Sequence, residues 1–158
     1  MRDHAVGVVG ALVAGADDAA EARRAVVQEE LAAARADLVA LYFIADPKLV
    51  ALGIVPEESH EDIIRAEYEA YTRNAILQLR RIREGAQIEQ DHMRNRQMIV
   101  RWLMDKTEAI EVRERDGKTF YVMSDWQVFR EGVGELLADV QRIKSEGDYD
   151  AAKQLFET

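Results

Sequence analysis

Apolar residues recur with the period of an α-helix over almost the whole chain, and this pattern limits the fold more than any other feature. The clearest apolar stripe alternates steps of four and three residues and consists of Val27, Leu31, Ala34, Leu38, Leu41 and Ala45. We expect Asp17 and Asp18 to cap this helix, with the apolar segment 5–16 forming a separate packed helix before it. Asp46 and Pro47 should end it, because proline cannot continue a helix.

The same period predicts further helices downstream. A short helix should lie between Pro47 and Gly53, and longer ones should follow over residues 56–83 and 87–106. Ser124 to Gln127 reads as a capping box that opens another helix, which Gly147 should close before a last short helix over residues 149–156. The helix after the capping box should bury Phe129, Val133, Leu136, Val140 and Ile143.

Only residues 110–123 depart from the helical period. Ile110, Val112, Phe120 and Val122 alternate with polar neighbours, and Asp116-Gly117 supplies a tight turn. We expect a two-stranded hairpin that lies against the helices, since isolated hairpins are marginal in water. The sequence therefore predicts a single all-α domain over residues 1–158, a helical bundle of five to seven helices with one small β-hairpin.

The composition excludes several function classes. A net charge of −9 disfavours nucleic-acid binding, because a phosphate backbone needs a basic face. The basic clusters at residues 80–83 and 94–96 have acidic neighbours, so we interpret them as solvated helix faces. The chain has no cysteine, which excludes disulfides and thiolate ligands and fits a cytoplasmic protein. The apolar segment 5–16 is too short to cross a bilayer, so no membrane partner is expected.

One motif inside the long apolar stripe reads Leu31-Ala-Ala-Ala-Arg-Ala-Asp37. It resembles the second zinc motif of the dipeptidyl peptidase III family of metallopeptidases, in its bacterial form. Three further segments resemble the same family in matching order and approximate spacing: Glu89–Gln97, Arg115–Tyr121 and Gln141–Lys153. The resemblance covers residues 31–158 and implies part of the helical catalytic lobe, with residues 1–30 unmatched.

The resemblance implies that this chain lacks zinc ligands that the family has. The family motif is Leu-Glu-Glu-x-Arg-Ala-Asp (or Glu), and its second glutamate binds zinc. Ala32 and Ala33 stand at the two glutamate positions, and a methyl group cannot coordinate a metal. Asp37 falls on an acid that supports a ligand, and His92 falls on a histidine that contacts the substrate. The family's first zinc motif, His-Glu-x-x-Gly-His, is absent, since only His4 precedes the second motif.

Two polar residues, His92 and Asn95, interrupt the apolar stripe of the helix expected over residues 87–106. A lone histidine on such a stripe is most often a hydrogen-bonded core residue. With Asn95 one turn away, and given the resemblance, His92 could instead line a small polar pocket together with Asp37. Both interpretations remain open at the level of the sequence.

A metal site elsewhere in the chain has weak support. Glu57-x-x-His60 and Glu89-x-x-His92 have the spacing found in carboxylate-bridged di-iron bundles. Such a core also needs glutamates on facing helices, and the long helix offers Ala32 and Ala33 at the best place for them. We therefore expect neither a metal site nor a cofactor.

Three hypotheses for the function follow. The first is a non-catalytic helical bundle, a scaffold or interaction module derived from a dipeptidyl peptidase III-like subdomain by trimming, engineering or drift. It would bind a second copy or a protein partner through an apolar patch that a missing lobe leaves exposed. The second is a small-molecule-binding bundle with a pocket around His92. The third is a component of a zinc peptidase that a separate polypeptide completes. No catalytic residue is assigned.

Overall fold

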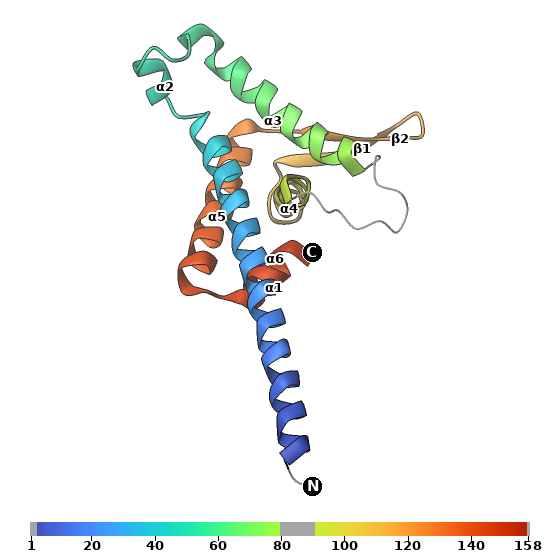
Figure 1. The fold of residues 1–158 in the computed structure, drawn as a ribbon. Coiled ribbons are helices and arrows are strands. Elements are labelled where there is room, and N and C mark those ends of the chain that lie inside the picture. The colour runs from blue at the N-terminus through green and yellow to red at the C-terminus, as the bar shows by residue number, and fades with distance from the viewer. Residues whose placement is uncertain (1–2, 80–90, 158) are drawn as a thin grey trace.

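The computed structural model describes the backbone of residues 3–79 and 91–157, and the side chains of residues 18–76 and 93–156. The described part contains six helices and one two-stranded antiparallel sheet (Figure 1), which confirms the predicted all-α fold with one hairpin. The elements are α1 (Asp3–Phe43), α2 (Lys48–Ala51), α3 (Glu57–Leu79), α4 (Asp91–Lys106), β1 (Ile110–Arg115), β2 (Lys118–Met123), α5 (Trp126–Glu146) and α6 (Tyr149–Glu157).

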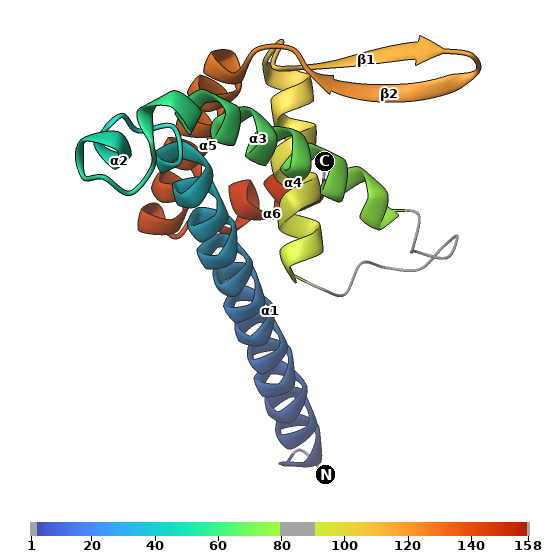
Figure 2. The same ribbon diagram turned by 90° about the horizontal axis from the view of Figure 1, so that it is seen from above.

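Helix α1 is continuous over 41 residues, so the predicted separate helix over residues 5–16 is wrong. Asp17 and Asp18 lie inside the helix instead of capping it. The surrounding sequence is rich in alanine, and an aspartate inside a helix costs less than about 1 kcal/mol relative to alanine. The N-terminal part of α1 extends away from the other helices in both views (Figures 1 and 2). No helix within the described ranges is both long and apolar enough to cross a membrane.

The core lies between the C-terminal half of α1 and helices α3, α4 and α5. The predicted stripe of α1 is buried from Leu31 to Ala45, and all five apolar residues predicted for α5 are buried as well. The ring of Tyr68 on α3 stacks on Phe129 of α5 with 4.2 Å between centroids. Gly132 lets α5 approach α4 closely, because a Cβ there would lie 2.7 Å from Cδ2 of Leu103.

The C-terminal end of α1 is held by side chains from two other helices. The last carbonyls of a helix have no partner within it and need donors from elsewhere. Three side chains of α3 and α5 donate to carbonyls here: Tyr68 to Leu41 at 2.8 Å, Arg130 to Tyr42 at 3.2 Å and His60 to Ile44 at 2.8 Å. The end of α1 is thereby fixed to both helices.

The turn after α1 follows the sequence prediction. Asp46 accepts a hydrogen bond from the N–H of Lys48 at 2.9 Å, and Gly53 adopts a φ of +69° after α2. Helix α3 then begins at Glu57, directly after Pro56. The predicted end of this helix at residue 83 and the predicted start of the next at residue 87 lie outside the described residues.

The hairpin projects from the bundle, with only its base packed (Figures 1 and 2). Ile110 and Met123 are buried, whereas Val112 is 52% and Phe120 46% exposed. The expectation that the hairpin lies against the helices is therefore wrong beyond its base. Asp116 and Gly117 form the turn, with φ values of +53° and +70° typical of a type I′ turn.

Helix α5 is capped by Asp125, one residue later than the predicted Ser124. The Asp125 carboxylate accepts hydrogen bonds from the backbone N–H groups of Gln127 and Val128. The hydroxyl of Ser124 instead donates to the carbonyl of Glu108. At the other end of α5, Gly147 adopts the left-handed conformation with a φ of +66°, as predicted.

Candidate functional site

The two alanines of the zinc-like motif lie on α1, in the part that packs against the body. Ala32 and Ala33 are both partly buried, and the next residue, Ala34, is fully buried in the core. The methyl groups of Ala32 and Ala33 therefore lie at the border between the buried and the exposed side of α1. The polar groups of this region come from the neighbouring turns of α1 and from helices α3 and α4.

One turn before the alanines, Glu30 forms an ion pair with Arg94 of α4. The Glu30 side chain is only 3% exposed, and its Oε1 accepts a hydrogen bond from Nη1 of Arg94 at 2.5 Å. The interpretation of residues 94–96 as a solvated helix face is therefore wrong. Sequence reasoning also missed Glu30, although its position four residues before Ala34 places it beside the buried stripe.

One turn after the alanines, Asp37 contacts the phenol of Tyr71 on α3. The Tyr71 hydroxyl donates to Oδ2 of Asp37 at 3.3 Å, and the guanidinium of Arg96 lies 5.7 Å from the Tyr71 ring centroid. Burial, and then the negative charge of Asp37, raise the pKa of Tyr71 well above its usual value. Tyr71 is therefore a neutral donor at physiological pH, and it joins α1 to α3.

Asn95 and His92 lie on α4, which faces the same part of α1. Asn95 is fully buried, and neither its Oδ1 nor its Nδ2 has a hydrogen-bond partner within the described residues. His92 belongs to the first turn of α4, but its side chain lies outside the described residues. The structure places Asp37 against Tyr71 and shows Asn95 as a buried polar group, while the predicted pocket around His92 remains a prediction.

A comparison with protein families covers this whole region. The family model described as peptidase family M49 matches residues 22–158, a span that contains every residue of the site described above. The chain belongs to peptidase family M49. This confirms the resemblance to the dipeptidyl peptidase III family. The match begins at Ala22, upstream of the segment that carried the resemblance. No curated protein matches the chain significantly.

The M49 resemblance implies zinc, and the residues at this place do not fit the metal. A catalytic zinc site takes three protein ligands with nitrogen, oxygen or sulfur donors. Ala33 offers none, and the flanking carboxylates of Glu30 and Asp37 are engaged by Arg94 and Tyr71. Among the residues that the structure describes, no group of three or more histidines, cysteines, aspartates and glutamates is placed to hold a metal ion.

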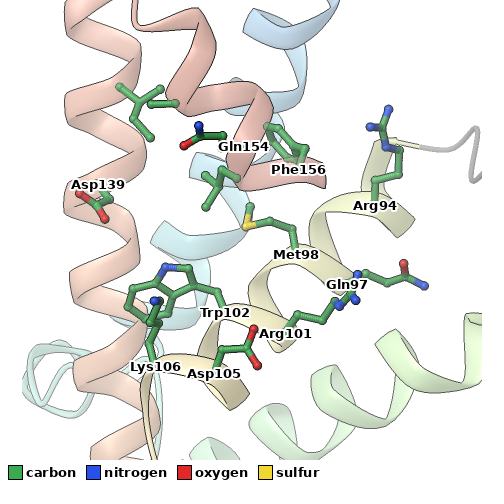
Figure 3. Close-up of a pocket in the computed structure, with 13 residues that line it drawn as sticks. Arg94, Gln97, Met98, Arg101, Trp102, Asp105, Lys106, Asp139, Gln154 and Phe156 are labelled. Atoms are coloured by element: carbon green, nitrogen blue, oxygen red, sulfur yellow. The ribbon is translucent and has the colours of Figure 1, made fainter. Parts of the chain in front are cut away.

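A groove of about 750 Å³ opens beside the Glu30–Arg94 pair, between α4, α5 and α6 (Figure 3). Met98 and Trp102 of α4 and Phe156 of α6 supply apolar surface, while Arg101 and Asp105 lie on the α4 side. The groove carries charges of both signs and selects no single ligand chemistry. It is a surface of this M49 chain that no sequence motif indicated.

Proposed function

We propose that this chain is a non-catalytic member of peptidase family M49 whose helical body acts as a scaffold or interaction module. The observation that carries the proposal is Ala33, which stands at the position of a zinc-binding glutamate and has no donor atom. The helical framework is kept here, while the carboxylate that binds zinc in the family is lost.

The contacts on either side of Ala33 support this proposal. Glu30 and Asp37 are the acids closest in sequence to Ala33 on the same side of α1, and each is tied to another helix. Freeing Glu30 for a metal would leave Arg94 without this partner, and breaking a buried ion pair costs about 3–5 kcal/mol. These carboxylates act in packing helices together, which is what a scaffold requires.

The test compares the purified chain with a double variant, Ala32→Glu/Ala33→Glu, after incubation with zinc and dialysis. Elemental analysis measures bound zinc, and mass spectrometry follows cleavage of short peptides. We expect no stoichiometric zinc and no cleavage for the wild-type chain. The double variant restores carboxylates without the first motif, so it should gain weak zinc affinity and no peptidase activity. Zinc-dependent, chelator-sensitive cleavage by the wild-type chain would overturn the proposal.

A second candidate function is the binding of a small polar molecule next to Asn95. Its support is the fully buried Asn95 amide, which has no partner among the described side chains, because buried polar groups are nearly always hydrogen-bonded. A screen of small amides and carboxylates by thermal shift, with Asn95→Leu as the matched variant, tests this. Ligands that stabilise the wild-type chain and not the variant support the pocket, and equal shifts in both proteins reject it.

The third candidate, a peptidase component completed by another chain, makes a separate prediction. Mixing this protein with a polypeptide that carries His-Glu-x-x-Gly-His should then create a tight zinc site. Because Ala33 still lacks a donor, we expect such a mixture to bind no more zinc than the second polypeptide does alone.

A further inference from the structure

Strand β2 presents an edge that no other strand covers within the described part of the chain. Ser124 donates its N–H to the carbonyl of Ala109 at 2.9 Å, so these two residues form a hydrogen-bonded pair. In an antiparallel ladder, such pairs alternate with pairs whose backbone N–H and carbonyl groups point away from the partner strand. With the register that pairs Arg113 with Phe120, the backbone groups of Thr119 and Tyr121 therefore point away from β1. They have no backbone hydrogen bond within the described ranges. Such an edge is a template for another strand.

A cleft of about 890 Å³ runs along this edge and separates β2 from α3. One wall is a stripe of α3 with helical spacing, formed by Glu69, Thr72, Arg73 and Ile76, and the other wall is residues 117–123. Figure 2 shows that the tip of the hairpin and the C-terminal part of α3 point in different directions. No residue of β1 lines it. Strand β2 and one side of α3 therefore form the two walls of a single cleft.

The α3 wall of this cleft contains a buried hydroxyl that has no partner among the described residues. Thr72 is 2% exposed and lines the α3 wall, yet its Oγ1 has no hydrogen-bond partner in the described part of the chain. Because this oxygen is itself buried, it is not open to a ligand in the cleft. The unpaired backbone groups of the β2 edge are the groups that a peptide main chain satisfies.

We infer that this cleft binds an extended peptide segment of a protein partner, which adds as a third strand to β2. The inference builds on the proposed role as an interaction module and names the surface involved. Main-chain hydrogen bonds to the β2 edge would give affinity, and pockets for alternate side chains would give specificity. The volume of the cleft lies within the range of ligand pockets, about 300–1,000 Å³.

The lining side chains define the sequence that such a segment should have. Phe120 and Tyr121 are 46% and 39% exposed and offer apolar contact to valine-like side chains. Arg73 and Lys118 line opposite walls, and neither forms an ion pair with another described residue. Glu69 is the single acid on the walls. The cleft therefore favours a strand in which apolar residues alternate with acidic ones.

The probe is a fluorescently labelled peptide in which valine alternates with glutamate and threonine, titrated with the full chain and followed by anisotropy. The control peptide has the same side chains with alternate backbone amides N-methylated, so it cannot pair with the β2 edge. We expect binding of the first peptide and a loss of about tenfold or more for the second, since two backbone hydrogen bonds are removed. Equal binding of the two peptides, or no binding, would refute strand addition.

Matched proline variants locate the edge that is used. Thr119 and Glu114 lie directly opposite each other, and the N–H of each points away from the partner strand. Thr119→Pro blocks the β2 edge and should reduce peptide binding about tenfold or more, whereas Glu114→Pro blocks only the β1 edge and should leave it unchanged. Circular dichroism confirms that each variant is folded.

Two outcomes separate this inference from its alternatives. If the peptide-free chain forms dimers that Thr119→Pro abolishes, the occupant is a second copy and the partner assignment is wrong. If Glu114→Pro and Thr119→Pro weaken peptide binding equally, the β2 cleft is not the site. Neither result changes the zinc and peptidase measurements, so failure of the cleft and failure of the non-catalytic role are distinguishable.

Discussion

The variant Tyr68→Phe should lower the free energy of unfolding at neutral pH and make it less sensitive to alkali. Tyr68 is fully buried, stacks on Phe129 and donates to the carbonyl of Leu41 at 2.8 Å. Phenylalanine keeps the stacked ring but removes the donor from a carbonyl near the end of α1. Leaving a buried acceptor without its partner costs about 1–3 kcal/mol.

The alkaline effect follows from the Tyr68 pKa. Burial raises this pKa from 10.0 to about 12, although Arg130 lowers it slightly. A raised pKa means that folding favours the neutral phenol. This contribution is fully present below pH 10 and is lost as the pH rises through 12. A difference of two pKa units corresponds to about 3 kcal/mol at 1.36 kcal/mol per unit.

The assay is urea unfolding of the wild-type chain and the variant at several values between pH 7 and pH 12. Tyr71 titrates in the same direction in both proteins, so the difference between them isolates Tyr68. We expect the difference in stability to be largest at neutral pH and to shrink above pH 10. The variant Tyr121→Phe, at a partly exposed tyrosine, controls for the loss of a hydroxyl. A constant difference across the pH range would refute the burial argument for Tyr68.

Three further substitutions test local packing. Gly132→Ala should lower the free energy of unfolding in urea by about 1–3 kcal/mol, because the added Cβ meets Leu103. Unchanged stability would show that α4 and α5 separate easily. Thr72→Val should raise the melting temperature of the peptide-free chain, because it removes a buried hydroxyl, worth about 1 kcal/mol, that has no partner among the described residues. A lower melting temperature would mean that the hydroxyl is paired. Asp125→Ala should lower the free energy of unfolding by about 1 kcal/mol, because the cap of α5 is lost. Asp125→Asn keeps a capping side chain and should be nearly neutral when both variants are measured by calorimetry.

The helices were predictable where apolar residues repeat with the helical period. The α1 stripe and the stripe of α5 define the core, and Gly147 ends α5 as expected. The break predicted at Asp17 failed because capping preference is only a weak local signal, which an alanine-rich helix overrides. The hairpin turn was predictable from Asp116 and Gly117, but its projection was not, since alternation alone does not say what each face packs against.

The candidate site was predictable only in part. The motif identified the place on α1 where Ala33 lies, because a missing donor can be read directly from the sequence. Its neighbours could not be read in this way. The pairing of Glu30 with Arg94 joins residues 64 positions apart, and the contact of Asp37 with Tyr71 joins residues 34 positions apart. Local periodicity contains no information about which charged side chains meet across helices.

Zinc content measured after incubation with excess metal and exhaustive dialysis tests the central claim most directly. With methyl groups at residues 32 and 33, and with Glu30 and Asp37 engaged by other helices, the wild-type chain should retain only background zinc. A stoichiometric amount of zinc that resists dialysis and disappears in Asp37→Asn would contradict the account, because these residues would then form a metal site.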